Sequence, residues 1–374
     1  MEAASLRSWF GLQAVRALSD ASLCRLLQAF GPPDAVRAAS AEALMAAGGI
    51  GRSVALAIRQ MPDQETRNTI DREIKGVERL RLQVVTFLDE AYPPRLRMIP
   101  DPPPLLYVGG TLDRRDHQAI AIVGSRKASA AGRTFTEELS RDLASAGFTI
   151  VSGLAVGIDA AAHRGALAAG GRTVGVMGCG LDQTYPPEHE GLRRQIEASG
   201  AVMGELPLGS YPYAYHFPRR NRIISGMSLG VVVTEAALKS GSLITARLAA
   251  EQGREVFASP GFAKAENSRG PNSLIKQGAK LVETAADVIE ELLPQLEESF
   301  RERLSVLAPA APGSASPVDR REAPVYDLLS FEPTHIDDLI ARTGLPAADM
   351  AGLLLAMELK GAIRQLPGHA YVRT

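Results

Sequence analysis

The sequence of 374 residues contains few cysteines, few aromatic residues and almost no net charge. Its two cysteines, Cys24 and Cys179, lie far apart. A disulfide framework is thereby excluded, and we expect two free thiols and no cysteine-based zinc site. The absence of any run of eighteen apolar residues excludes a membrane span and a membrane partner. The first residues, 1–7, lack a basic segment that leads into a long apolar stretch, so we expect no secretion signal and a cytoplasmic location.

The formal net charge of −1, from 41 Lys and Arg against 42 Asp and Glu, gives no overall indication of a nucleic-acid partner. Only local clusters of one sign are informative. The sequence also lacks the G-x-G-x-x-G pattern of dinucleotide sites, the P-loop with its terminal Gly-Lys-Ser/Thr, and histidine pairs with metal-ligand spacing. We therefore expect neither a cofactor nor a metal. The length and an apolar content of 45% are sufficient for two or three domains with buried cores.

Residues 1–84 are predicted to form a small helical domain. Leu23, Leu26, Leu27 and Phe30 have the spacing of one helical face. The glycine-rich turn at residues 48–51 resembles that of a SAM or helix-hairpin-helix domain, in which backbone N–H groups at a helix start hold a DNA phosphate. The alternative is a helical packing domain without a DNA contact.

Residues 85–293 alternate between short apolar strands and amphipathic helices. This pattern predicts an α/β domain with a Rossmann-like, doubly wound, mostly parallel sheet. Glycines such as Gly147, Gly200 and Gly253 mark the ends of the intervening helices. The predicted strands are 119–123, 148–151, 173–177, 201–204, 230–234, 255–258 and 280–282.

Two further segments follow this α/β domain. Residues 294–320 are predicted to be a flexible linker, because 308–317 consist of Ala, Pro, Gly and Ser. Residues 321–374 have the pattern of three helices and a hairpin, which predicts a winged helix. Its expected recognition helix, 347–359, carries two acidic residues and no Lys or Arg. We therefore interpret this domain as a protein-contact or auxiliary module; duplex binding through Arg364 and Arg373 is the alternative.

The distinctive segments of the central region all follow predicted strands. Ligands of open α/β sheets bind beyond the carboxyl ends of the strands. Glycines in such loops allow close backbone approach, and exposed N–H groups bind anions. For each loop taken alone, a glycine that merely lets the chain turn is the alternative. Together the loops predict an extended polyanion site formed by Gly124, Ser125, Arg126, Lys127, Ser152, Gly153, Gly157, Phe217, Arg219, Arg220, Asn221, Arg222, Lys239, Ser240, Gly241 and Ser242.

Residues 217–222 are the most informative of these segments. Three arginines follow an aromatic residue within five positions, in what we predict to be the loop before a helix. Each guanidinium can hold a phosphate through two hydrogen bonds, and Phe217 offers a flat face to a base. The alternative is a solvated turn whose arginines pair with acidic neighbours. If Arg126 and Arg220 lay on opposite sides of the molecule, this site would be refuted.

Three acidic residues near these loops are predicted to brace them. Asp159 opens a helix and is expected to be its N-cap. Asp182 caps or supports its own loop, and Glu235 is expected to orient an arginine. His163, one helical turn after Asp159, is interpreted as a packing residue and not as a catalyst.

The ordered motifs of residues 120–282 resemble the DNA-processing protein A family, also called DprA or Smf. The matching segments are Gly124 to Arg126, Ser152 to Asp159, Gly178 to Pro186, Phe217 to Ile224, Ser240 to Thr245, Pro260-Gly261 and Asn272 to Ala279. The flanking domains fit a three-domain layout of that family. His189 departs from it, because the family often has Asn there.

This resemblance implies a non-enzymatic protein that binds single-stranded DNA through an extended Rossmann domain. It also implies a homodimer that protects incoming DNA and helps to load the RecA recombinase in natural transformation. The family's DNA-contacting arginine maps to Arg126. Two other functions remain open. One is a nucleotide N-glycosidic-bond hydrolase with Glu235 as acid or nucleophile, although residues 231–234 are a plain strand where such enzymes carry a glycine-rich phosphate loop. The other is a duplex-binding regulator.

Overall fold

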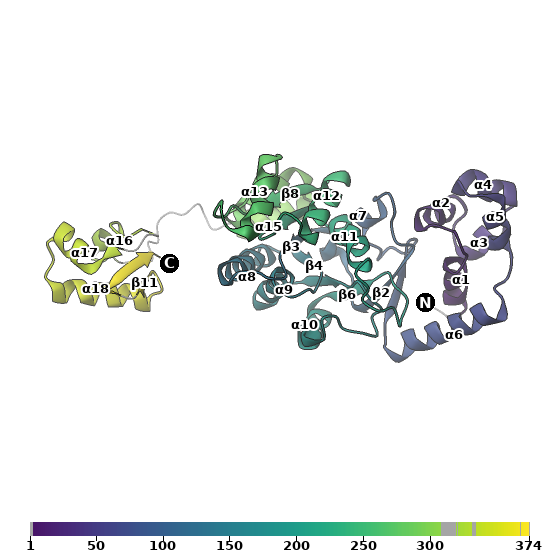
Figure 1. Cartoon of the computed structure of the whole chain (residues 1–374), viewed down its shortest axis with the longest axis horizontal. Coiled ribbons are helices and arrows are strands. Elements are labelled where there is room, and N and C mark those ends of the chain that lie inside the picture. Colours follow the sequence, from purple (N-terminus) through teal and green to yellow (C-terminus); the bar gives the residue numbers. More distant parts are fainter. Residues whose placement is uncertain (1–2, 308–318, 320, 331–333, 367, 374) are drawn as a thin grey trace. The chain divides into compact units, whose positions relative to one another are not determined.

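The computed structural model describes residues 3–307, 319, 321–330, 334–366 and 368–373. It divides into two compact units, Met1–Arg301 and Glu302–Thr374, which are described separately (Figure 1). The predicted Ala- and Pro-rich segment 308–317 lies outside the described residues.

The first unit is built on a nine-stranded sheet with the order β1-β2-β6-β5-β4-β3-β7-β8-β9. Strands β3 to β9 run parallel, and β1 and β2 extend the sheet antiparallel beyond β6. All seven predicted strands are present, whereas β1 and β2 were not predicted. The strands are β1 Gln83–Thr86, β2 Leu105–Gly110, β3 Ala119–Val123, β4 Thr149–Ser152, β5 Thr173–Val176, β6 Ala201–Gly204, β7 Gly230–Val233, β8 Glu255–Ala258 and β9 Lys280–Leu281.

Helices cover both faces of this sheet (Figure 1). One face carries α8 Ala130–Ser145, α9 Ile158–Ala168 and α10 Glu190–Ser199, and α14 Ala285–Leu292 packs on α8. The other carries α11 His216–Met227, α12 Gly241–Glu251 and α13 Arg269–Lys276. The strand order reverses at β3, which lies between β4 and β7. The fold is therefore the predicted doubly wound α/β type, and β3 marks its switch point.

The N-terminal helices belong to the same unit as the sheet. They are α1 Ala3–Gln13, α2 Asp20–Phe30, α3 Pro33–Ala38, α4 Ala41–Gly48, α5 Arg52–Arg59 and α6 Gln64–Arg79. Phe10 of α1 stacks on Tyr107 of β2, with ring centroids 6.1 Å apart, so one apolar core runs from these helices into the sheet. The turn between α4 and α5 is present, and Gly49 there adopts a left-handed conformation with φ of 59°.

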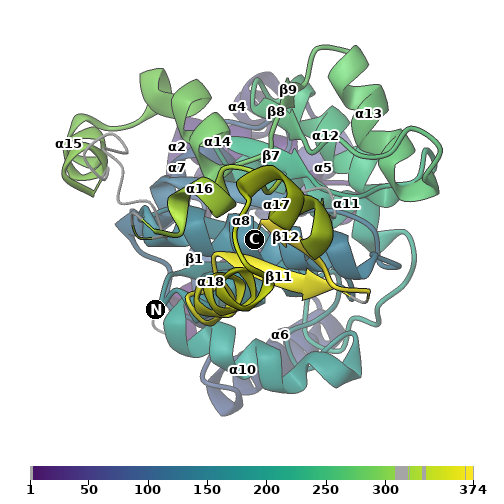
Figure 2. The ribbon, with the colours of Figure 1, turned by 90° about the vertical axis from the view of Figure 1, so that its left-hand side faces the viewer.

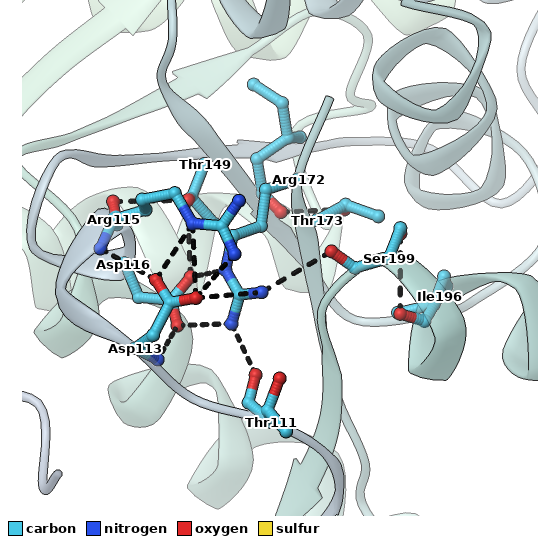
Figure 3. Close-up of polar contacts among 10 residues, drawn as sticks. Thr111, Asp113, Arg115, Asp116, Thr149, Arg172, Thr173, Ile196 and Ser199 are labelled. Atoms are coloured by element: carbon cyan, nitrogen blue, oxygen red, sulfur yellow. Dashed lines mark hydrogen bonds and ion pairs between the residues drawn. The ribbon is translucent and has the colours of Figure 1, made fainter. Parts of the chain in front are cut away.

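A buried ion-pair network closes the amino edge of the sheet (Figure 3). Arg172, just before β5, donates from Nε to Asp116 Oδ1 at 2.6 Å and from Nη2 to Asp116 Oδ2 at 2.8 Å. Its guanidinium also contacts Asp113 and the carbonyl of Thr111. A buried arginine is tolerated only when its donors are satisfied, so this cluster fixes the start of β5 against the segment before β3. It lies at the edge opposite the strand-end loops.

In the described part of the second unit, α16, α17 and α18 lie beside a small sheet (Figure 2). Its elements are α16 Ala323–Tyr326, β10 Thr334–His335, α17 Ile336–Thr343, α18 Ala347–Leu359, β11 Ile363–Leu366 and β12 Ala370–Arg373. The order of the sheet is β10-β12-β11. Arg373, proposed above as a duplex contact, stacks on Tyr326 at 4.2 Å and donates to its carbonyl oxygen.

Part of the segment predicted as a flexible linker, residues 294–320, is helical. Helix α15 spans Glu298–Leu307, and its Phe300 packs edge-on against Phe148 with ring centroids 4.8 Å apart. The remaining described elements are short helical turns: α7 Pro94–Arg97, η1 Arg114–His117, η2 Pro187–His189, η3 Glu266–Ser268 and η4 Leu293–Gln295.

Within the described ranges, no single helix has the length and apolar composition needed to cross a membrane. Two bent pairs of helices, α4 with α5 and α17 with α18, meet this requirement of length and composition only when the two helices of a pair are taken together.

Candidate nucleic-acid interface

The strand-end loops of β3, β7 and β8 and the start of α11 enclose a cleft of about 1140 Å³ at the carboxyl edge of the sheet. Thirteen of the nineteen sequence-predicted binding and bracing residues line it: Gly124, Ser125, Arg126, Lys127, Asp159, Phe217, Arg220, Asn221, Glu235, Lys239, Ser240, Gly241 and Ser242. The remaining six are Ser152, Gly153, Gly157, Asp182, Arg219 and Arg222. The loops thus converge in space as their common position after parallel strands predicts.

Phe217 lines the cleft. It belongs to the first turn of α11 and not to a loop before the helix, which corrects the sequence prediction. The guanidinium carbons of Arg126 and Arg220 lie 5.1 and 6.0 Å from the centroid of its ring. The two arginines therefore share one side of the molecule. Cation–π attraction holds the exposed Arg126 side chain over the ring, where its remaining donors face the cleft.

Arg220 is more deeply buried than a surface phosphate ligand. Its Nη1 donates to the carbonyl of Gly153 at 2.8 Å and to that of Val176, so it joins the ends of β4 and β5. Burial lowers the pKa of Arg220 to about 10, against the opposing charge of Asp159. Arg220 therefore supports the floor of the cleft, and its replacement is expected to affect stability as well as binding.

Arg222 does not reach the cleft, contrary to the sequence prediction. It is buried and pairs with Glu205 at 2.7 Å and with Asp101 at 2.8 Å. Arg219 is half exposed, and it pairs with Asp20 at 2.7 Å and with Glu205 at 3.2 Å. For these two arginines, the alternative given in the sequence analysis, that they pair with acidic neighbours, is therefore correct. They attach α11 to α2 and β6 and leave the other face of α11 to the cleft.

Glu235 holds the loop that carries Arg126. Its carboxylate accepts hydrogen bonds from Ser129 N at 2.9 Å, Ser129 Oγ at 2.6 Å and Asn267 Nδ2 at 3.3 Å. The expected arginine partner is thus replaced by Ser129, the N-cap of α8, and by Asn267. Asn267 also donates to the Lys127 carbonyl at 2.9 Å. This clamp fixes the backbone that directly follows the exposed Arg126 and Lys127 side chains.

Two glycines and a serine around β4 have structural contacts instead of access to the cleft. A Cβ at Gly153 would lie 2.5 Å from the Arg220 guanidinium, and Gly157, with φ of 84°, packs against the Ser125 carbonyl. Ser152 donates to the Ile122 carbonyl at 2.6 Å. These residues allow the close packing that brings the loops together.

Asp159 braces the same loop from within α9 and is not its N-cap, since that position belongs to Gly157. Its carboxylate accepts from Gly153 N at 3.1 Å. Burial raises the pKa of Asp159, while Arg220 and the backbone donors oppose the shift. His189, the residue that departs from the family pattern, contacts the Leu154 carbonyl at 2.9 Å and holds this loop from the other side.

Lys239 to Ser242 form the wall of the cleft at the start of α12. Ser240 is the N-cap of this helix, and its Oγ lies 2.8 Å from that of Ser242. Asn221 donates to the Gly241 carbonyl at 3.3 Å, which ties α12 to α11. The helix start adds oriented N–H groups beside the exposed Lys239 ammonium, an arrangement that favours an anion.

Sequence reasoning missed Tyr185 and residues 265–268, which also line the cleft. Tyr185 contacts Phe217 with ring centroids 5.5 Å apart. Asn267 carries no motif in the sequence, since only the fold brings it to Lys127. Ser129 does carry a signal, as a serine directly before a helix.

The sequence and fold match known proteins over most of the chain. Residues 83–293 match the family described as DNA recombination-mediator protein A, and residues 309–369 match the DprA winged helix domain. The chain belongs to the DprA/Smf family. Protein Smf of Escherichia coli (strain K12) is 41% identical over 314 residues, which cover 82% of this chain and 81% of that protein. DNA processing protein DprA of Streptococcus pneumoniae (strain ATCC BAA-255 / R6) is 45% identical over 206 residues, or 55% of this chain and 73% of that protein.

Two solved structures of DprA proteins are similar to this family member. DprA from Streptococcus pneumoniae matches with a TM-score of 0.65 and 34% identity, over 78% of this chain and 98% of that one. DprA from Helicobacter pylori, whose structure concerns its single-stranded DNA binding mode, matches with a TM-score of 0.52 and 30% identity, over 58% of this chain and 99% of that one. Residues 83–293 thus belong to a DNA-processing family.

Proposed function

We propose that this chain binds single-stranded DNA in the cleft at the carboxyl edge of its sheet, without catalysing a reaction on it. The observation that carries the proposal is the exposed Arg126 held over Phe217 by a clamped loop, with Lys127 and Lys239 nearby. Cations along an aromatic-containing groove are the arrangement that tracks an unpaired phosphate backbone. The single-strand binding of the Helicobacter pylori relative supports the same assignment.

An oligonucleotide titration tests this proposal. The protein is titrated with a labelled single strand and with the corresponding duplex at two salt concentrations. We expect preference for the single strand, little dependence on base sequence, and an affinity that falls as salt rises. Equal affinity for the duplex, or binding that does not change with salt, would contradict it.

We further infer that the chain acts as a homodimer that protects incoming DNA and loads RecA on it during transformation. Membership in a family described as recombination mediators supports this inference. Sedimentation of the protein tests the dimer. Strand exchange by RecA on DNA coated with single-strand binding protein, with and without this chain, tests the loading.

The contacts of Glu235 disfavour the alternative of an N-glycosidic-bond hydrolase. Both of its carboxylate oxygens accept hydrogen bonds from groups of the protein. A carboxylate that fixes a loop in this way is poorly placed to protonate or attack a sugar. Release of free base from nucleoside monophosphates would reverse this conclusion.

A further inference from the structure

Three exposed tyrosines lie on the segment that leads into α11. Tyr211, Tyr213 and Tyr215 are 64%, 53% and 68% exposed. The rings of Tyr213 and Tyr215 stack almost parallel, at 8° with centroids 5.7 Å apart, and Tyr211 contacts Tyr213 edge-on at 6.2 Å. We call these three residues the tyrosine ladder. Three large aromatic side chains at alternate positions on one exposed segment are unusual for a surface without a ligand.

The ladder adjoins the cleft. Pro212 and Ala214, which alternate with the tyrosines, line the cleft, whereas the tyrosines themselves do not, and Phe217 follows two residues after Tyr215. The ring of Phe217 is already contacted by Tyr185, Arg126 and Arg220. The tyrosines of the ladder stay more than half exposed, although the His216 ring contacts Tyr213 and Tyr215 edge-on, with centroids 5.7 and 4.4 Å away.

The backbone of the ladder is fixed before any ligand arrives. Tyr213 N donates to the Tyr211 carbonyl at 2.8 Å, and the His216 ring contacts the same carbonyl at 3.0 Å. The preceding residues are anchored as well, because Asp182 accepts from Gly209 N at 2.8 Å. A stacking platform held in one conformation loses little entropy when a base is placed on it.

We propose that the tyrosine ladder extends the binding path of the cleft and stacks the bases of the unpaired strand where it crosses the rim. This inference rests on the function proposed above and adds a second, aromatic part to the site. The cleft supplies the cations that hold the phosphates. The ladder supplies faces for the bases, and stacking accepts any base.

The test compares two 20-nucleotide strands of equal length and charge. One is oligo-dT, and the other keeps bases only at its six central positions and is abasic on both flanks. The parent is expected to prefer the first strand, because only its flanking bases can stack on the ladder. The double variant Tyr213→Ala/Tyr215→Ala is expected to lose about 25-fold in affinity for oligo-dT, at about fivefold for each lost base stack, and to bind both strands equally.

Three controls make the result decisive. Tyr213→Phe/Tyr215→Phe keeps the ring faces and is expected to bind like the parent. Met61→Ala, an exposed side chain of the N-terminal helices, controls for a general effect of truncation. Unaltered melting temperatures are expected for all variants, since the replaced side chains are more than half exposed.

The outcomes separate the two proposals. If the alanine double variant keeps the parent's preference for oligo-dT, the ladder does not bind bases. A protein partner would then be the better candidate to cover the ladder. If the parent binds neither strand, the proposed function itself fails. Equal binding of both strands by the parent would refute the ladder and leave the cleft intact.

Discussion

Replacing Arg126 by Ala is expected to weaken DNA binding and leave the fold intact. Replacing Arg222 by Ala is expected to lower the stability of the fold and to leave DNA binding by the folded protein unchanged. Arg126 contacts the Phe217 ring and Arg222 follows Phe217 by five residues, and the sequence prediction placed both in the same site. They differ in their surroundings. Arg126 is exposed and contacts the protein through the Phe217 ring, whereas Arg222 is buried among three carboxylates.

The structure gives magnitudes for both effects. Three exposed cationic side chains, Arg126, Lys127 and Lys239, line the cleft, whereas Arg220 is buried in its floor. At about −0.7 per neutralised phosphate, the logarithm of the affinity should fall with that of salt with a slope of about −2.1. Arg126→Ala should reduce this slope to about −1.4. The loss of one charged hydrogen bond, about 1.5–3 kcal/mol, lowers the affinity about 10- to 150-fold.

For Arg222→Ala the loss is in the free energy of unfolding. Removing one partner of a buried ion pair costs about 3–5 kcal/mol, because Glu205 then stays buried with only Arg219 as a charged partner among its described contacts. Because Arg126 is exposed, Arg126→Ala should lower the free energy of unfolding by at most about 1 kcal/mol, the value of its cation–π contact.

Urea denaturation and oligonucleotide titration at 50 and 200 mM salt measure the two quantities on the same preparations. From 50 to 200 mM the affinity should fall about 20-fold for the parent and for folded Arg222→Ala, but only about sevenfold for Arg126→Ala. If Arg222→Ala changed the salt slope and Arg126→Ala did not, the assignment of the two arginines would be reversed.

Three further predictions concern residues around the cleft. Gly157→Ala should lower the free energy of unfolding by about 2 kcal/mol or more and weaken binding, because φ is 84° and the new Cβ would lie 2.3 Å from the Ser125 carbonyl; an unchanged urea midpoint would contradict this. Neither the parent nor Glu235→Gln should release base from nucleoside monophosphates, and the variant, which keeps one carbonyl acceptor, should still bind DNA. Burial and nearby positive charge lower the pKa of His163 to about 3 from 6.5, so the folded chain binds fewer protons than the unfolded chain between these values. Stability is therefore complete above pH 6.5 and falls by up to about 5 kcal/mol as the pH drops toward 3, and His163→Gln should flatten this dependence in urea titrations at several pH values.

The parallel part of the sheet could be predicted because each of its strands is an apolar run followed by a glycine or a polar turn. The two antiparallel strands could not. β2, Leu105–Gly110, follows four residues that include three prolines and ends in two glycines, which is the local pattern of a loop. Its strand conformation comes from pairing with β6 on one side and β1 on the other, a tertiary effect that no local pattern shows.

The start of α11 was the decisive error at the site. Tyr215 is its N-cap residue but makes no side-chain capping bond, so the sequence carries no start signal. Pro218 is compatible with the first turn of a helix, where a missing N–H is tolerated. Once this segment is helical, Arg219 and Arg222 lie three positions apart on one face, whereas Phe217 and Arg220 share another.

The pairing of charges explains how a chain with a net charge of −1 presents a cationic cleft. Within α11, Arg219 and Arg222 are neutralised by Asp20, Asp101 and Glu205, and Arg220 is buried against backbone carbonyls. The exposed cations Arg126, Lys127 and Lys239 lie instead in the loops after β3 and β7, and among the described residues none of them forms an ion pair with a carboxylate. Net charge and the density of arginine in the sequence are therefore both poor measures of a binding site. What decides is which cations the fold has already paired, and the arginine-rich start of α11 holds the paired ones.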